Sequence, residues 1–357
     1  MEHMIAMFAE QIVAASVDRT GLCISGGGTK DWYGQAPSGA RLTTREHTGI
    51  VDYEPTELVI TARCGTPLSE IEAALAAQRQ MLAFEPPHFG SNATLGGAVA
   101  AGLSGPRRQA VGAMRDFVLG VTMMNGQGQV LHFGGQVMKN VAGYDVSRLL
   151  AGSLGTLGLL LEVSLKVLPK PITETTVRLS MPQAEAITQL NIWGGQPLPI
   201  SASLWQDDSL TIRLSGAQAA VGAARLLMGG EEIEGEPFWQ AAREQTLPLF
   251  AGINEADALW RLSVPSTTPP LDLPGKQLIE WGGAQRWLRT TAAAGTTDAI
   301  RATVSAAGGH ATLFRGGDKM QGVFQPLAPA VARIHQRLKA TFDPQSIFNP
   351  GRMYLDL

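Results

Sequence analysis

The sequence has few cysteines, no long apolar run and no large excess of charge of either sign. Its two cysteines, Cys23 and Cys64, exclude a disulfide scaffold and a cysteine-rich zinc or iron–sulfur site. No run approaches the roughly 18 apolar residues that span a bilayer. The first 19 residues mix acidic with apolar side chains, which predicts an amphipathic helix rather than an export signal. Lys and Arg number 28 against 31 Asp and Glu, which excludes a generic nucleic-acid-binding protein.

Two parts of the chain differ in character, and 357 residues are enough for two domains. The first part is rich in glycine and ends near Pro169 and Pro171. In the second part, strand-like and helix-like segments alternate in two sets, 175–228 and 259–314. Each set approximates β-α-β-β-α-β, which predicts a layered α+β domain. A last amphipathic helix has an apolar stripe, expected in the core, that consists of Leu327, Val331, Ile334 and Leu338.

Glycine-rich segments recur four times in the first part, at 25–30, 90–97, 102–108 and 152–158. Glycine allows backbone N–H groups to converge on one point, as in a phosphate-binding nest. The first segment alone is equally consistent with a tight turn, because it matches neither the dinucleotide fingerprint nor the P-loop. Four such segments with Ser and Thr hydroxyls predict backbone wrapped around a large polar ligand. Helix capping by Thr94 would add to anion binding there.

Several motifs in this order carry a family resemblance. They are Ser25-Gly26-Gly27-Gly28-Thr29-Lys30, Ala93-Thr94-Leu95-Gly96-Gly97, Ser104-Gly105-Pro106-Arg107-Arg108, Arg115-Asp116, the segment from Lys139 to Asp145, the segment from Gly152 to Gly158, and a closing Phe342-Asp343-Pro344 with Asn349-Pro350-Gly351-Arg352. Together they resemble the FAD-binding domain family of the vanillyl-alcohol-oxidase type. Within it, the chain is most similar to the FAD-binding subunits of bacterial glycolate oxidases. The resemblance is strong over 20–170 and at the C-terminus and weak from about 175 to 325.

The resemblance implies an α+β fold with a two-lobed FAD-binding domain of the PCMH type. We expect this domain over 1–171, a ferredoxin-like α+β cap that meets substrate or a partner over 172–325, and a C-terminal segment, 326–357, that packs back on the FAD domain. Thr29 stands where some relatives have a histidine that tethers the flavin, so FAD is expected to be non-covalent. The cofactor-binding residues that the resemblance implies are Ser25, Gly26, Gly27, Gly28, Thr29, Lys30, Thr94, Leu95, Gly96, Gly97, Ser104, Gly105, Gly112, Asp116, Gly158 and Leu160.

The implied function is that of an FAD-binding subunit in a complex that oxidises a 2-hydroxy acid, glycolate or D-lactate. The implied partners are a second, catalytic FAD-containing subunit and an iron–sulfur subunit, with no nucleic acid and no transmembrane segment. We expect a cytoplasmic protein. Association with the cytoplasmic face of the inner membrane, through the complex, stays open. Catalytic relatives carry a metal-binding H-x-G-D-G-N stretch, and none of the six histidines lies in one. Two alternatives stay open: a scaffold with a vestigial flavin site, and a stand-alone alcohol or sugar oxidase.

The sequence offers only weak candidates for catalytic residues, and it predicts no metal site. Arg286, Arg289 and Arg315 could clamp a substrate carboxylate, although solvated surface charge explains them as well. His310 and His88 could act as a base or could be structural. The tryptophans are concentrated from Trp193 onward, and some of them could belong to a partner surface. Cys23 is expected in the core, and a reactive thiol remains open for Cys64.

Overall fold

The computed structural model describes residues 2–135, 145–254, 256–293 and 295–357. The motif residues 139–144 lie outside these ranges. The chain forms two compact units. Unit 1 comprises Met1–Leu103, Ala113–Pro169 and Pro326–Leu357, and unit 2 comprises Ser104–Gly112 and Lys170–Gln325. Within the described ranges, no helix has the length and apolar character needed to cross a bilayer.

Unit 1 begins with the expected amphipathic helix and a small parallel sheet. Helix α1 (Glu2–Asp18) precedes β1 (Leu22–Ser25) and β2 (Ala40–Thr43), and the two strands pair in parallel. Phe8 and Ile12 of α1 are buried against the small sheet and against strand β8. Unit 1 also contains α2 (Leu68–Ala77), β5 (Gln80–Met81), α3 (Leu95–Ala101) and β9 (Leu168–Pro169). Pro67 is the residue before α2, and Thr66 Oγ1 bonds to the backbone of Gly49.

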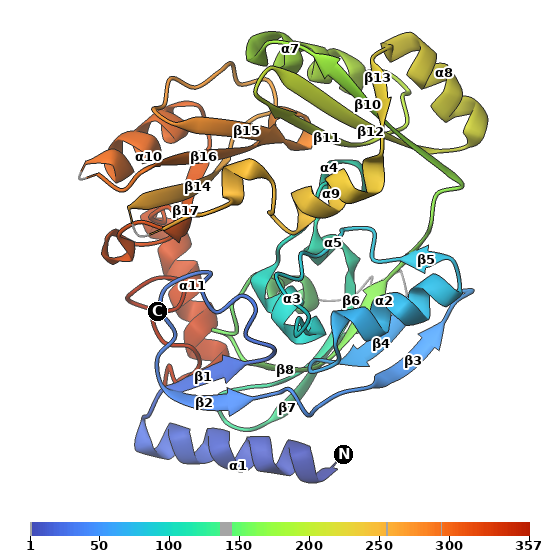
Figure 1. Cartoon of the computed structure of the whole chain (residues 1–357). Coiled ribbons are helices and arrows are strands. Elements are labelled where there is room, and N and C mark those ends of the chain that lie inside the picture. The colour runs from blue at the N-terminus through green and yellow to red at the C-terminus, as the bar shows by residue number, and fades with distance from the viewer. Residues whose placement is uncertain (1, 136–144, 255, 294) are drawn as a thin grey trace. The chain divides into compact units, whose positions relative to one another are not determined.

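The second lobe of unit 1 is a five-stranded antiparallel sheet (Figure 1). Its strands, in spatial order, are β3 (Ile50–Glu54), β4 (Val59–Arg63), β8 (Leu159–Lys166), β6 (Val118–Met124) and β7 (Val130–Gly134). Strands β6 and β7 form a hairpin whose loop runs from Asn125 to Gln129. The short helices α5 (Met114–Phe117) and α6 (Val146–Leu149) and the long α11 (Pro329–Phe342) complete the unit.

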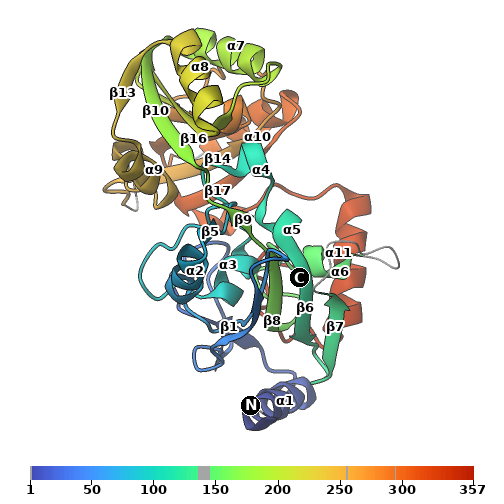
Figure 2. The ribbon, with the colours of Figure 1, turned by 90° about the vertical axis from the view of Figure 1, so that its right-hand side faces the viewer.

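Unit 2 is built on an eight-stranded antiparallel sheet, and its three longest helices lie on one face of that sheet (Figure 2). The first half runs β10 (Thr173–Ser180), α7 (Gln183–Gly194), β11 (Ile200–Gln206), β12 (Ser209–Gly216), α8 (Gln218–Met228) and β13 (Glu231–Ile233). The second half runs β14 (Asp257–Ser263), β15 (Lys276–Glu280), β16 (Gln285–Thr291), α10 (Thr296–Ala306) and β17 (His310–Gly316). Two short helices, α4 (Arg108–Val111) and α9 (Gly235–Arg243), also belong to this unit.

The two halves of this sheet share one topology. The spatial order is β13-β10-β12-β11 and then β15-β16-β14-β17. We number the strands of each half in chain order and follow each half from the outer edge of the sheet inward. Both halves then have the order 4-1-3-2, and the second strands of the two halves, β11 and β15, pair in the middle of the sheet. The register places Ile279 and Arg286 on one face of the sheet, which is the face that carries the core of each half. The helices α7, α8 and α10 therefore all cover that face. The second half only approximates a β-α-β-β-α-β unit, because the proline-rich loop between β14 and β15 stands where that unit has its first helix.

Two sequence expectations about buried apolar residues were wrong. The stripe on α11 does not face a core, because Val331 is 41% and Ile334 is 56% exposed. The tryptophans do not form a partner surface, since all but one of the six from Trp193 onward are buried. The buried ones are Trp193, Trp205, Trp239, Trp260 and Trp287.

Candidate cofactor site

The glycine segment after β1 turns against a second loop, and this contact determines where glycine is needed. A Cβ on Gly27 would lie 1.5 Å from the carbonyl oxygen of Asn92. A Cβ on Gly26 would lie 2.5 Å from Thr94 Oγ1. Gly28 has open space around it but a φ of +77°, which favours glycine. The first two glycines therefore allow two loops to touch, and the third allows the turn.

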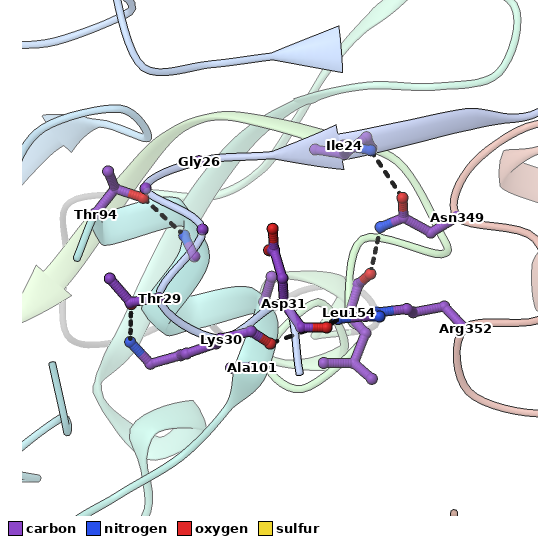
Figure 3. A pocket seen from close by; sticks show the side chains of 14 residues that line it. Ile24, Gly26, Thr29, Lys30, Asp31, Thr94, Ala101, Leu154, Asn349 and Arg352 are labelled. Carbon is purple, nitrogen blue, oxygen red and sulfur yellow. Dashed lines mark hydrogen bonds between the residues drawn. The ribbon is translucent and has the colours of Figure 1, made fainter. Parts of the chain in front are cut away.

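A polar cavity of about 80 Å³ opens on this turn (Figure 3). From the turn and β1 it is lined by Ile24, Gly26, Gly27, Gly28, Thr29, Lys30 and Asp31. From the rest of unit 1 it is lined by Thr94, Gly97, Ala100, Ala101, Leu154, Asn349 and Arg352. Pockets for whole drug-sized ligands measure about 300–1,000 Å³. The cavity therefore matches a group the size of a diphosphate, not an entire dinucleotide.

Two cations and one carboxylate line this cavity. Lys30 Nζ donates to the carbonyl of His88 at 3.2 Å and to Thr29 Oγ1 at 3.3 Å. Arg352 donates to the carbonyl of Asp31 at 2.7 Å, and burial lowers the pKa of its guanidinium, although Asp31 opposes that shift. Phosphate oxygens bind well to such donors. The lining residues therefore fit the diphosphate of a dinucleotide cofactor.

Comparison with known proteins agrees with this geometry. A model of the FAD-binding domain family, described as "FAD binding domain", matches residues 6–134. The glycolate oxidase subunit GlcE of Escherichia coli is 52% identical over 98% of this chain and 97% of its own length. The chain belongs to the GlcE family. Its cofactor is FAD, and it is an FAD-dependent oxidoreductase subunit.

More distant relatives of this GlcE-family chain match mainly its first part. The D-lactate dehydrogenase of Archaeoglobus fulgidus is 29% identical over 56% of this chain and 48% of its own length. The glycolate oxidase subunit GlcD of Bacillus subtilis is 29% identical over 50% of this chain and 38% of its own length. A solved alkyldihydroxyacetonephosphate synthase covers 96% of this chain and 73% of its own, with a TM-score of 0.67 and 14% identity, which shows a shared fold alone.

The structure brings together seven of the residues that the sequence assigned to FAD. Those that line the cavity are Gly26, Gly27, Gly28, Thr29, Lys30, Thr94 and Gly97. Residues that the sequence missed include Asp31, Asn349 and Arg352. The last two lie in the quoted C-terminal motif, but nothing in the spacing of that motif placed them beside residue 30.

The other assigned residues lie elsewhere in this GlcE-family chain. Ser25, Leu95, Gly96, Gly158 and Leu160 are buried in unit 1, outside the cavity lining. Ser104, Gly105 and Gly112 belong to unit 2, and Asp116 is exposed, with Oδ2 accepting from the N–H of Ala113 at 2.8 Å.

Glycine at two of these positions is explained by packing. A Cβ on Gly96 would lie 2.7 Å from the Cβ of Cys64, and one on Gly158 would lie 2.1 Å from Met123 Cε. Thr94 does cap α3, with Oγ1 accepting from the N–H of Gly97 at 3.3 Å. That N–H is therefore already bonded, and α3 adds less to anion binding than expected.

The arginines proposed as carboxylate clamps serve the protein's own backbone. Arg286 is fully buried and donates to the carbonyls of Thr268, Pro269 and Gly283, and burial lowers its pKa to about 10. Arg289 donates to Asp257 Oδ2 at 2.9 Å and to three backbone carbonyls. Both are structural, and neither is solvated surface charge. Burial also lowers the pKa of Arg315 to about 10.

The two histidine candidates and Cys64 differ in their surroundings, and His310 is exposed. His88 Nε2 lies 3.2 Å from Glu72 Oε1. His310 begins β17, and burial together with Arg261 lowers its pKa. Burial raises the pKa of the Cys64 thiol to about 12, which makes it unreactive. No group of three or more potential metal-ligating side chains is present among the residues that the structure describes.

Proposed function

We propose that this chain is the FAD-binding subunit of a complex that oxidises glycolate, and that it holds FAD without a covalent bond. One observation carries the proposal: a diphosphate-sized cavity, lined by the Gly26–Lys30 turn and by Arg352, lies in a chain 52% identical to a glycolate oxidase subunit. FAD bound in this chain would supply two-electron redox chemistry to the complex. The protein's own part is to orient the cofactor. The Gly26–Thr29 backbone cradles the diphosphate, and Lys30 and Arg352 balance its charge.

The substrate oxidation itself is assigned to a partner. In unit 2, Arg286 and Arg289 are committed to backbone carbonyls and to Asp257, and the sequence lacks the H-x-G-D-G-N stretch. We therefore assign catalysis to a second FAD-containing subunit and onward electron transfer to an iron–sulfur subunit of the same cytoplasmic complex. D-lactate is a second substrate, because a D-lactate dehydrogenase is among the relatives. A peripheral place of the complex on the inner membrane is part of the same proposal.

The cofactor proposal is tested by purifying the chain and measuring flavin released by acid. Gly28→Val is the informative variant, because its Cβ meets no atom closer than 3.4 Å. A change in FAD binding therefore comes from the altered conformation of the glycine turn and not from a clash with a neighbouring loop. Gly27→Val is a poor test, since the new side chain strikes the Asn92 backbone and disrupts the loops whether or not FAD binds. We expect about one FAD per chain in the wild type and little in Gly28→Val at equal folding. A colourless chain that takes up no added FAD contradicts the proposal and favours a scaffold with a vestigial site.

The division of labour is tested by separating the chain from its partners. The isolated FAD-loaded chain should not reduce a dye acceptor with glycolate, and activity should return when the co-purifying subunits are added. Turnover by the isolated chain would favour a stand-alone oxidase instead.

A further inference from the structure

The C-terminal motif lies against the strand that leads into the glycine turn. The N–H of Leu22 donates to the carbonyl of Ile347 at 2.7 Å, and the N–H of Asn349 donates to that of Leu22 at 2.8 Å. Residues about 325 positions apart are thus joined as neighbouring extended chains. The end of the protein is therefore built into the first lobe of unit 1.

Asn349 connects two walls of the cavity through both ends of its amide. Its Oδ1 accepts from the N–H of Ile24 at 2.8 Å, and its Nδ2 donates to the carbonyl of Leu154 at 2.6 Å (Figure 3). Gly155 makes room for this amide, because a Cβ there would lie 2.7 Å from Nδ2. Asn349 therefore fixes the distance between the strand before the glycine turn and the 152–158 segment.

Arg352 holds the far side of the same turn. Its guanidinium donates to the carbonyls of Lys30, Asp31 and Gln35, and the residue is 7% exposed. A buried guanidinium is costly unless it is hydrogen-bonded or paired with charge. Three backbone carbonyls supply hydrogen bonds but no full negative charge. Among the described residues that line the cavity, Asp31 is the one carboxylate, and its side chain is 42% exposed and 3.9 Å from Arg41.

We propose that Arg352 is part of the cofactor site, where its charge selects flavins that carry a diphosphate, and that Asn349 positions the loop that binds it. With Lys30 and Arg352 against Asp31, the lining has a net positive charge that a diphosphate would neutralise. If Arg352 served the fold alone, its contribution to the stability of the protein would be the same whether or not a diphosphate was bound. This inference rests on the proposed FAD function and adds to it a residue from the opposite end of the chain.

The test compares two flavins on three forms of the full chain. FAD carries a diphosphate and riboflavin carries none, and the quenching of flavin fluorescence reports the dissociation constant of each. For Arg352→Gln we expect binding of FAD to weaken at least tenfold and binding of riboflavin to change less than twofold. Arg352→Lys keeps the charge without the planar fork and should fall between the wild type and Arg352→Gln. Arg337→Gln, at an exposed arginine of α11 outside the cavity lining, is the matched control and should bind FAD like the wild type.

Folding is followed separately by the thermal unfolding of each FAD-free variant. If Arg352→Gln does not fold, the role of Arg352 is judged from the FAD and riboflavin affinities of Arg352→Lys and from the salt dependence of flavin binding by the wild type. FAD binding should weaken with added salt and riboflavin binding should not. Equal losses for both flavins, or no loss for FAD, overturn the role of Arg352. A wild-type chain that binds neither flavin overturns the proposed function instead, so the two failures are distinguishable.

The positioning role of Asn349 has its own readout. Asn349→Gly removes both side-chain hydrogen bonds, to Ile24 and to Leu154, adds no charge to the cavity, and tolerates the φ of +41° at this position. We expect it to weaken FAD and ADP alike while the flavin absorption spectrum of the bound state is unchanged. Unaltered affinity for both ligands would contradict the positioning role.

Discussion

Lys339 and Asp343 form an ion pair inside unit 1, with Nζ 2.8 Å from Oδ2 and side chains 5% and 0% exposed. Lys339 also donates to the carbonyls of Thr156 and Phe348, both at 2.8 Å. Asp343 accepts from the N–H groups of Ile347 and Phe348. This pair therefore ties the last turn of α11 to the 152–158 segment and to the C-terminal motif.

Removing one partner of this pair should strongly destabilise the protein. Lys339→Met leaves the Asp343 carboxylate buried without its cation, which costs about 3–5 kcal/mol. Urea unfolding of the FAD-free chain measures the change. Arg337→Met on the same helix replaces an exposed cation and should change stability by less than about 0.5 kcal/mol. Equal stability of the two variants would contradict the structural role of the pair.

Glu174 should make the stability of unit 2 decrease at acidic pH. Burial alone would raise its pKa, but Arg213, Arg107 and the Ser215 hydroxyl outweigh burial and lower the pKa below its ordinary value of 4.5. A carboxyl with a lowered folded pKa stabilises the protein above the ordinary value, and this contribution is lost as pH falls through the folded pKa. Thermal unfolding temperatures measured from pH 6 to about pH 3 should therefore fall.

The variant Glu174→Gln isolates this effect. It should be less stable than the wild type near neutral pH, because the buried Arg107 loses its charged partner. Its unfolding temperature should also vary less with pH below about 4.5. Glu236→Gln, at an exposed glutamate, is the control and should keep the wild-type pH profile. Parallel profiles for wild type and Glu174→Gln would contradict the assignment.

Neither cysteine should react while the protein is folded. Burial raises the pKa of the Cys64 thiol to about 12 and also raises that of Cys23, and the thiolate is the reactive form. Iodoacetamide at pH 8 should therefore add no mass to the native chain and two groups to the denatured chain. Rapid labelling of native Cys64, seen by mass spectrometry, would restore the reactive-thiol interpretation.

Local patterns predicted most elements because the relevant signals lie within a few residues. The alternation of apolar and polar residues over 159–167 is typical of a strand, and β8 lies there, and the predicted cap Thr94 does precede α3. The glycine turn was also found, since Gly26 to Gly28 are adjacent in the chain. What failed was the interpretation of single glycines. Gly96 and Gly158 are required by contacts with Cys64 and Met123, which no local pattern reveals.

Long-range contacts explain the residues that the sequence missed. Asn349 and Arg352 reach the glycine turn across more than 300 residues, and only the fold brings them together. The stripe on α11 failed for a related reason. Its spacing correctly predicts an amphipathic helix, but whether the apolar side meets a core depends on neighbours, and Ile334 is 56% exposed among the residues that the structure describes.

A variant of the fully buried Arg286 can distinguish a role in stabilising the fold from a role in binding substrate. Its guanidinium satisfies the carbonyls of Thr268, Pro269 and Gly283, so it holds the proline-rich loop that replaces a helix in the second half of unit 2. Arg286→Met would fill much of the space but leave these carbonyls without a donor, at about 1–3 kcal/mol for each one left unsatisfied.

We expect Arg286→Met to lower the free energy of unfolding by at least about 2 kcal/mol. FAD bound per folded chain and the KM of the assembled complex for glycolate should stay as in the wild type. Arg178→Met, which replaces an exposed arginine on β10, is the stability control. A carboxylate clamp predicts the opposite pattern, with normal stability and a KM raised at least tenfold. The two readouts therefore separate a backbone anchor from a substrate-binding residue.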